Sequence, residues 1–411
     1  AKNGILMKEA NFKETEIGKI PVDWEVEYLG ENLAENPKYG INAASVPFNS
    51  NLPTYLRITD ISDDGRYLNN SPVSVNNSES SKYFLEEGDL VFARTGASVG
   101  KTYLYNLNDG RLVYAGFLIK LKPDNQTLNS VFLKYLTQNK FYKDWIIQNS
   151  MRTGQPGING IQIKSFQIPL PPLSEQEKIA EVLSDTDLWI ESTEALLAKK
   201  RQIKKGAMQK LLSPKEDWEV RKLGEVVKIT RGASPRPIDN PIWFQEDSKI
   251  GWVRISDVSK SNKFLFRTTQ KLSPEGISKS RFVHSNSLIM SICATLGKPI
   301  ITTFDVCIHD GFVVFSDLKI EKEYLYNYLK FIEDDWPKTG QTGPQMNLNK
   351  TIINGTEINF PEKAKQQEIA EILSSMDLEI ESLENRLQKA RQLKQGMMQD
   401  LLTGKVRLIE N

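Results

Sequence analysis

An internal duplication is the feature that most constrains how this chain can fold. Segment 179–212 aligns without gaps on segment 369–402, an offset of 190 residues, and 21 of the 34 aligned positions are identical. Fainter matches precede each copy: Asp23-Trp24 recurs as Asp217-Trp218, and the segment around Arg57 recurs around Arg254. A repeat of this length indicates that one structural unit occurs twice. We therefore predict the order globular unit, helix, globular unit, helix.

The two best-conserved segments are predicted to be long helices that pack on each other. Ser174 and Glu177 have the spacing of a capping box, which predicts that the first helix starts there, and Pro214 should end that helix. The second helix should begin soon after Pro361 and end near Gly404. Apolar residues recur at intervals of three and four, as in a coiled-coil seam that reaches Leu393. The residues expected at the interface between the helices or with a partner are Ile179, Leu183, Ile190, Leu197, Ile369, Leu373, Ile380 and Leu387.

The charges of these helices predict antiparallel pairing. Between Glu175 and Glu194 the first helix has seven acids and one base, Lys178, whereas Lys199 to Lys210 contains six bases and no acid. The second helix repeats this division. Antiparallel pairing sets each acidic half against a basic half, whereas parallel pairing would oppose like charges. Further apolar residues off the seam leave room for a helix from a partner: Val182, Trp189, Leu196, Ile372 and Leu402.

The globular parts have the pattern of mixed α and β structure. Short apolar runs predict strands such as 89–93 and 163–168 in the first part and 288–292 in the second, and 130–139 and 322–331 predict helices. The chain is thus expected to divide into a globular domain at 1–173, a helix at 174–213, a second globular domain at 214–361, and a helix with a tail at 362–411. The fold class is α/β (α+β) with a pseudo-two-fold repeat.

Composition sets a few outer limits. A membrane span needs about 20 apolar residues in a row, and no run approaches that length. Two cysteines are too few for a disulfide framework, so we expect a reducing cytoplasm. The net charge of +1 neither favours nor excludes a nucleic-acid partner, because net charge does not report local basic patches.

Three patterns imitate catalytic motifs, and we interpret each as structural. Gly96-Ala-Ser-Val-Gly100-Lys101 is one residue short of a phosphate-binding loop, so it predicts a tight turn that presents a lysine. Asn240-Pro241-Ile242-Trp243 is close to an amino-methyltransferase tetrapeptide but lacks a glycine-rich cofactor loop. Cys293, Cys307 and His309 lack the paired spacing of a metal site. We therefore expect no catalytic residue and no metal site.

The remaining chemistry is that of DNA binding. Arginine and lysine bind phosphates, arginine reads guanine, and glutamine or asparagine reads adenine. The candidates in the first globular part are Arg57, Arg94, Lys101, Arg152, Gln155 and Asn159. The candidates in the second part are Arg231, Arg236, Arg254, Lys298, Lys338, Gln341 and Asn347.

Several runs resemble the specificity subunit of type I restriction-modification systems. They are Glu16–Val26, Pro169–Ala180, Gly206–Leu212 and Leu401–Lys405. Because the first run lies near the start of the chain and the last near its end, the resemblance extends over nearly the whole chain. The resemblance implies two target-recognition domains held apart by an antiparallel helix pair, each reading half of an interrupted double-stranded DNA site. It also implies methyltransferase subunits that dock on the helices and restriction subunits that join them. S-adenosylmethionine, ATP and Mg would bind only to those partners, and this chain would hold no cofactor.

Two other classes of function stay open at this point. The chain could be an adaptor whose helices build a protein assembly without reading DNA, or an enzyme based on the near phosphate-binding loop. A gel shift with random duplex distinguishes the first alternative, and nucleotide binding distinguishes the second. If the helices space the two readers, the DNA site should consist of two short blocks separated by several unread base pairs.

Overall fold

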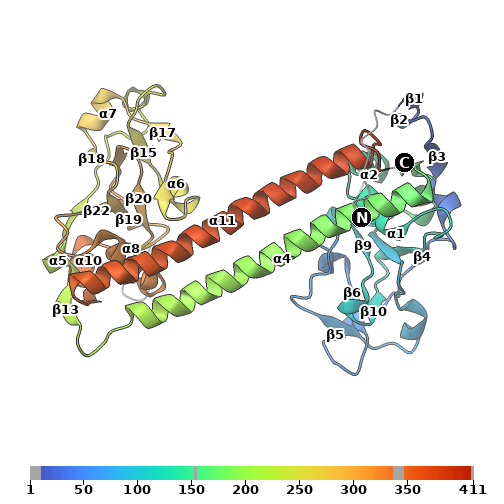
Figure 1. The fold of residues 1–411 in the computed structure, drawn as a ribbon, viewed down its shortest axis with the longest axis horizontal. Helices are drawn as coiled ribbons and strands as arrows, with labels where there is room; N and C mark the ends of the chain where they lie inside the picture. Colours follow the sequence, from blue (N-terminus) through green and yellow to red (C-terminus); the bar gives the residue numbers. More distant parts are fainter. Residues whose placement is uncertain (1–10, 152–154, 337–346, 409–411) are drawn as a thin grey trace, which may run out of the picture. The chain divides into compact units, whose positions relative to one another are not determined.

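The computed structural model describes residues 11–151, 155–336 and 347–408. It contains two compact units: unit 1 comprises Ala1–Glu194 and Arg386–Asn411, and unit 2 comprises Ala195–Asn385. Each unit therefore contains one globular part and one half of each long helix, α4 (Leu173–Leu212) and α11 (Lys363–Leu401) (Figure 1). This grouping cuts across both helices, so the predicted division into four segments stays a prediction.

Unit 1 is built from two four-stranded sheets, two strand pairs and three short helices. One sheet has the order β4 (Lys38–Tyr39), β11 (Leu118–Leu121), β8 (Leu90–Ala93), β9 (Thr102–Leu104). The other has the order β10 (Leu112–Tyr114), β6 (Thr54–Leu56), β7 (Val73–Val75), β5 (Ser45–Pro47). The strand pairs are β1 (Phe12–Thr15) with β2 (Gly18–Pro21), and β3 (Glu25–Tyr28) with β12 (Gln167–Leu170). The helices are α1 (Ser130–Leu136), α2 (Lys140–Ser150) and α3 (Gly160–Lys164).

Among the described residues, unit 2 repeats the two sheets and one of the two strand pairs, and its larger sheet has five strands in place of four. Its larger sheet has the order β14 (Lys228–Arg231), β22 (Phe312–Ser316), β19 (Leu288–Ser291), β20 (Pro299–Thr302), β16 (Phe264–Leu265). The smaller sheet has the order β17 (Gln270–Lys271), β15 (Gly251–Val253), β21 (Val306–Ile308), β18 (Arg281–Val283). β13 (Glu219–Lys222) pairs with β23 (Glu357–Phe360). The helices are α5 (Leu223–Val226), α6 (Ile255–Ser259), α7 (Pro274–Ser278), α8 (Lys322–Phe331) and α10 (Lys350–Gly355).

The predicted mixed α and β content and the duplication are confirmed at the level of topology. In both units the strand after the Asp-Trp pair joins the strand that precedes the long helix, as β3 with β12 and β13 with β23. The central strands β8 and β19 are apolar and fully buried because structure covers both of their faces. The strand predicted at 163–168 begins later than expected: residues 160–164 form α3, which Asn159 caps, and strand β12 starts only at Gln167.

Antiparallel packing of α4 and α11 is confirmed within each unit. In unit 1, Asp187 contacts Lys394 at 2.6 Å, and Glu194 contacts Arg391 at 2.6 Å. In unit 2, the residues 190 positions away make the same pairs, Asp377 with Lys204 and Glu384 with Arg201. The acidic half of each helix thus lies against the basic half of the other. The duplication therefore produces one set of ion pairs twice, once in each unit.

The helix seam is mostly apolar, and its two threonines are satisfied within their own helix. Seven of the eight interface candidates are buried and Ile380 is half-buried; the buried ones are Ile179, Leu183, Ile190, Leu197, Ile369, Leu373 and Leu387. Thr186 and Thr193 are also buried, and their hydroxyls donate to backbone carbonyls one turn earlier.

Two residues depart from the predicted helix faces. Leu393 was expected in the seam but is 54 % exposed. Lys394 takes that position because its ammonium group bonds Asp187 and lies 5.4 Å from the centre of the Tyr135 ring. Leu402 was expected on the free face of α11, but it is buried in the apolar core of unit 1. The spacing of apolar residues by three and four does not by itself indicate which turn of the helix places a charged residue in the seam.

The chain after α11 returns to unit 1 and is locked there by a buried arginine. Arg407 is 6 % exposed in its side chain and forms two bonds each to Glu175 and Asp23, all between 2.7 and 2.8 Å. Glu175, 2 % exposed, also accepts hydrogen bonds from the Trp24 indole and the Leu408 amide. The hydrogen bond from Arg407 lowers the pKa of Asp23. The tail, the start of α4 and the first strands thus form one structure.

Each globular part is also attached to its own half of the helix pair by polar contacts. In unit 1, Arg66 bonds Glu194 at 2.9 Å, and the Tyr135 hydroxyl donates to Asp187 at 2.7 Å. Burial alone would raise the pKa of Asp187, but the bond and charge of Lys394 outweigh burial and lower it. In unit 2, the Asn262 amide donates to Glu384 at 3.3 Å. The acid that pairs the helices therefore also anchors the globular part.

Candidate nucleic-acid interface

Three loops of unit 1 are joined by backbone hydrogen bonds into one surface, which we call junction 1. It consists of Tyr39, Arg94, Phe117 and residues 155–159. The Arg94 amide donates to the Phe117 carbonyl at 3.1 Å, and the Arg94 carbonyl accepts from the Ile158 amide at 2.9 Å. Gly40 permits close packing here, because a Cβ atom would lie 2.2 Å from the carbonyl oxygen of Ala115.

Unit 2 contains the same frame, junction 2, formed by Arg231, Ile292, residues 309–311 and residues 347–349. The Ile292 amide donates to the Gly311 carbonyl at 2.8 Å, and the Ile292 carbonyl accepts from the Leu348 amide at 2.9 Å. Gly232 has the place of Gly40, and a Cβ there would lie 2.0 Å from the His309 carbonyl oxygen. The backbone bonds therefore match one for one between the junctions.

The side chains on this common frame are different. Tyr39 corresponds to Arg231, and Phe117 corresponds to Gly311. Junction 1 is aromatic: Phe117 is 59 % exposed, and the Arg94 guanidinium lies 5.1 Å from the centre of the Tyr39 ring. Junction 2 has Arg231 in place of Tyr39, and two further arginines lie next to it: Arg236 contacts Asp310, and Arg281 contacts the Arg231 carbonyl. One scaffold with two different sets of exposed side chains is suited to recognise two different surfaces.

Junction 1 brings together three of the six candidates predicted in the first globular part. Arg94 is partly exposed, Gln155 is exposed, and Asn159 lies beside them but uses its side-chain oxygen to cap α3. The other two described candidates hold ion pairs instead. Arg57 binds Asp60 through two nitrogens at 2.9 and 2.7 Å, and Lys101 contacts Asp63 at 2.7 Å.

Junction 2 is organised around Asp310. The Arg231 Nε donates to the Asp310 carbonyl at 2.7 Å, and Arg236 contacts the Asp310 carboxylate at 3.3 Å. The Ser234 hydroxyl donates to the other carboxylate oxygen at 2.7 Å. This hydrogen bond and the charge of Arg236 lower the pKa of Asp310 despite its partial burial. Arg281 joins the cluster, because its Nε lies 3.4 Å from the Arg231 carbonyl oxygen.

The other candidates of the second globular part differ in what their side chains do. Arg254 is exposed at a turn that repeats the Arg57 turn, since the Arg254 amide donates to Asp257 at 3.0 Å. Lys298 donates to the carbonyls of Ser259 and Ser261, and burial lowers its pKa. Asn347 is exposed, but Asn349 is the structural equivalent of Asn159, because it caps α10. Arg152, Lys338 and Gln341 lie outside the described residues.

Several residues of the junctions were not among the predicted candidates. They are Tyr39, Phe117, Arg281 and Asp310. The predicted candidates are cationic and amide side chains in turns, whereas these residues are aromatic, acidic or at the start of a strand. Exposed aromatic residues beside a glycine turn were the available signal for Tyr39 and Phe117. Nothing local distinguishes Asp310.

The motifs that imitate catalytic sites have structural roles. The turn at Gly96–Lys101 leads into strand β9, whereas a phosphate-binding loop opens a helix. Asn240 caps a single turn, and the Trp243 indole donates to the Pro237 carbonyl at 2.8 Å. Within the described residues, no three histidine, cysteine, aspartate or glutamate side chains lie close enough to hold a metal ion.

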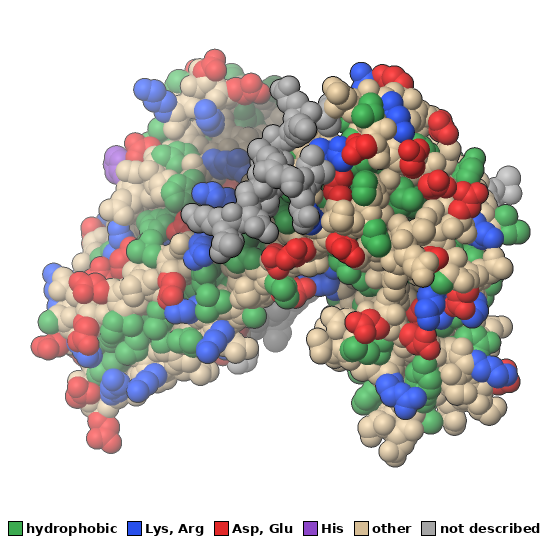
Figure 2. All heavy atoms as spheres, turned by 45° about the vertical axis from the view of Figure 1, so that its right-hand side comes forward, with side chains coloured by type: hydrophobic (Ala, Val, Ile, Leu, Met, Phe, Trp, Pro, Cys, Tyr) green, Lys and Arg blue, Asp and Glu red, His purple; other side chains and the backbone are tan. Residues whose placement is uncertain are grey.

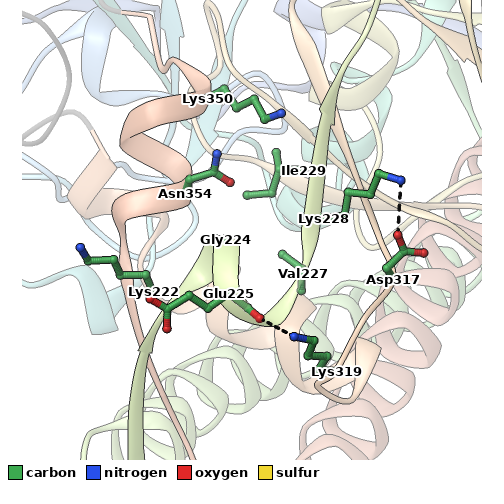
Figure 3. A pocket seen from close by; sticks show the side chains of 10 residues that line it. All are labelled: Lys222, Gly224, Glu225, Val227, Lys228, Ile229, Asp317, Lys319, Lys350 and Asn354. Carbon is green, nitrogen blue, oxygen red and sulfur yellow. Dashed lines mark hydrogen bonds and ion pairs between the residues drawn. The ribbon is translucent and has the colours of Figure 1, made fainter.

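A basic pocket of about 510 Å³ lies beside the first part of β14 in unit 2 (Figure 3). Four lysines line it: Lys222, Lys228, Lys319 and Lys350. Lys228 contacts Asp317 at 3.4 Å, and Lys319 donates to the Glu225 carbonyl at 3.0 Å (Figure 3). Strand β14 runs from Lys228 in this pocket to Arg231 in junction 2. The pocket adds positive charge to the domain that contains the arginine cluster.

The surface charges are otherwise mixed. Figure 2 shows lysines and arginines interspersed with acids over the visible face, in agreement with the net charge of +1. Among the described residues, no helix has the length and apolar character required to cross a membrane.

A duplicated α/β unit with divergent loop side chains, attached to an antiparallel helix pair, defines a class of two-site recognition scaffolds. The chain belongs to the family of the type I restriction modification DNA specificity domain, whose model matches residues 21–201 and again 215–392. It is therefore a specificity subunit of the type I restriction-modification class. The two matches correspond to the two copies of the repeat.

Relatives and solved structures agree with this assignment along the chain. A protein of Methanocaldococcus jannaschii assigned as the type I restriction enzyme MjaX specificity subunit is 28% identical over 98% of both chains. The MjaVIII specificity subunit of the same organism is 26% identical over 98% of this chain and 97% of its own. The fold is similar to that of the type I restriction-modification system S subunit from M. genitalium, with a TM-score of 0.61, 15% identity and coverage of 92% and 96%.

Proposed function

We propose that each globular unit reads one half of a bipartite double-stranded DNA site, with junctions 1 and 2 as the reading surfaces. The observation that carries this proposal is the matched backbone frame with different exposed side chains. Arginine and amide groups can bind base edges, and exposed aromatic groups can contact thymine methyls or stack on bases. Reading two different half-sites requires such a difference on a common scaffold.

We further propose that the helix pair docks methyltransferase subunits. Exposed apolar residues recur at equivalent positions of the repeat: Leu188 with Leu378, and Ile203 with Leu393. Unit 1 contains Leu188 and Leu393, while unit 2 contains Ile203 and Leu378. Exposed apolar residues on a paired helix favour a further helix as partner. Two equivalent surfaces would bind two copies of the same subunit.

In this proposal the chain recognises DNA in the cytoplasm and catalyses no step. The methyltransferase subunits supply adenine methylation with S-adenosylmethionine. Restriction subunits supply translocation and cleavage with ATP and Mg. The rival function is an adaptor that only assembles proteins. A gel shift at low salt, with and without the methyltransferase subunit, separates the two, because an adaptor alone would not change the mobility of the duplex.

Domain exchange tests independent reading. Replacing Lys215 to Pro361 by the matching segment of a relative should change one half of the methylated motif and preserve the other. The physical reason is that the backbone bonds of junction 2 lie inside this segment. The motif is measured by sequencing methylated genomic DNA from cells that express the hybrid with its partner. Simultaneous change of both halves would contradict independent reading, and the reciprocal exchange of 11–170 is the control.

A further inference from the structure

Asp310 occupies a central place in junction 2 that has no counterpart in junction 1. The residue before the frame glycine Gly311 is Asp310, whereas the residue before Phe117 is Gly116. Asp310 accepts from three side chains: its carbonyl from Arg231, and its two carboxylate oxygens from Ser234 and Arg236. The carbonyl oxygen and both carboxylate oxygens thus each accept a side-chain hydrogen bond within the protein. The carboxylate is therefore better placed to hold the side chains of Ser234 and Arg236 than to contact a DNA base.

One nitrogen of each arginine guanidinium group bonds Asp310, and the rest of each guanidinium group stays exposed. Arg231 uses Nε toward Asp310, so its two terminal nitrogens remain for a ligand. Arg236 is 72 % exposed and uses one terminal nitrogen toward the carboxylate. An arginine side chain whose guanidinium group is already held by a hydrogen bond within the protein loses less conformational freedom on binding than an unrestrained one. Paired terminal nitrogens match the two acceptors O6 and N7 of guanine in the major groove.

We propose that Asp310 is a positioning residue that presets Arg236 through its carboxylate and Arg231 through its backbone carbonyl, so that both arginines can read guanine in the half-site of unit 2. This inference rests on the proposed DNA-reading function. Asp310 also offsets part of the positive charge of the cluster, which weakens unspecific attraction to phosphates relative to base reading. Junction 1 has no such carboxylate and presents Tyr39 and Phe117, so the requirement for Asp310 belongs to one half-site only.

The test uses the complex of this chain with its methyltransferase partner. Its affinity is measured for duplexes in which each base pair of the site is changed in turn. Discrimination for guanine in the second half-site should fall by about fivefold or more in Asp310→Asn, as expected when the bidentate contact of Arg236 is loosened. Discrimination in the first half-site should stay unchanged. Arg236→Ala should show the same loss, and adding Asp310→Asn to Arg236→Ala should add little. Arg231→Ala should cause a separate loss, because Asp310→Asn keeps the backbone carbonyl that holds Arg231.

Two controls separate positioning from charge and from folding. Asp305→Asn alters an acid in the same domain with nearly the same side-chain exposure, 41% against 43% for Asp310, and should leave discrimination intact. Lys228→Ala in the basic pocket removes one charge without touching the cluster. Melting temperatures verify that all variants fold.

Three results would overturn the inference. If Asp310→Asn left guanine discrimination unchanged while Arg231→Ala only reduced the salt dependence, the arginines would bind phosphates. If both half-sites lost discrimination together, Asp310 would have a general structural role. If the wild-type complex bound no DNA, the proposed function itself would fail, and this inference with it.

Discussion

Replacing Leu383 and Leu387 by aspartate should unfold the helix pair at neutral pH. Both leucines are buried in the seam between α4 and α11, one in each compact unit. Removing a buried leucine from an apolar environment costs ~1.5–3 kcal/mol, so the double substitution should cost at least ~3–6 kcal/mol before the burial of charge is counted. A domain of ordinary stability, ~5–15 kcal/mol, would lose much of its margin. The urea midpoint followed by helical circular dichroism measures the effect.

The matched control places the same two aspartates on the exposed face of the same helix. Leu378→Asp with Leu393→Asp replaces side chains that are largely in solvent. The free energy of unfolding obtained from the urea transition should therefore change by no more than ~0.5 kcal/mol. The same control should lose the copurifying methyltransferase subunit, since these leucines belong to the proposed docking surface. Equal destabilisation by both pairs of substitutions would show that the seam is assigned to the wrong face.

Arg407→Ala should be the most destabilising single substitution considered for unit 1. The change leaves the Glu175 carboxylate buried with only the Trp24 indole and the Leu408 amide as donors. Removal of one partner of a buried ion pair costs ~3–5 kcal/mol, mostly because the other charge stays uncompensated. The measurement is hydrogen exchange of peptides from the start of α4 and from 11–28, which should lose protection while those of unit 2 keep theirs.

Neutralising both partners should restore part of that loss. Arg407→Met with Glu175→Gln keeps an acceptor for Trp24 and removes both buried charges. Lys405→Ala provides the surface control, because its pair with Asp400 is exposed and surface pairs are worth ~0–1 kcal/mol. If Lys405→Ala and Arg407→Ala had the same effect, the tail would not be locked by the buried arginine.

The features that sequence could predict are those encoded by periodicity and repetition. The long helices and their antiparallel pairing follow from the apolar spacing and from the opposed charges around Asp187 and Lys394. The duplicated α/β units follow from the offset of 190 residues. Within the seam, Leu393 was misassigned because the half-buried Lys394, which pairs with Asp187, replaces it. The sequence around Lys394 does not indicate that its partner acid lies on the other helix.

The candidate interface was harder to predict, because it is made by contacts between distant loops. The frame of junction 2 joins residues near 231, 292, 310 and 348 through single backbone hydrogen bonds. No periodic pattern encodes such bonds. Residue type alone therefore selected Arg57 and Lys298, whose side chains are occupied within the protein, and passed over Tyr39 and Asp310. The equivalence of Asn159 with Asn349 also became visible only through the helices that they cap.

The most direct test of the central claim is the methylation pattern of a genome in cells that express this chain with its methyltransferase partner. Two readers on one duplicated scaffold predict methylated adenines in a motif with two short, different blocks, separated by a constant number of unread base pairs. Catalytically intact partner expressed without this chain should leave those sites unmethylated. Methylation at one uninterrupted motif, or the same pattern without this chain, would contradict the account.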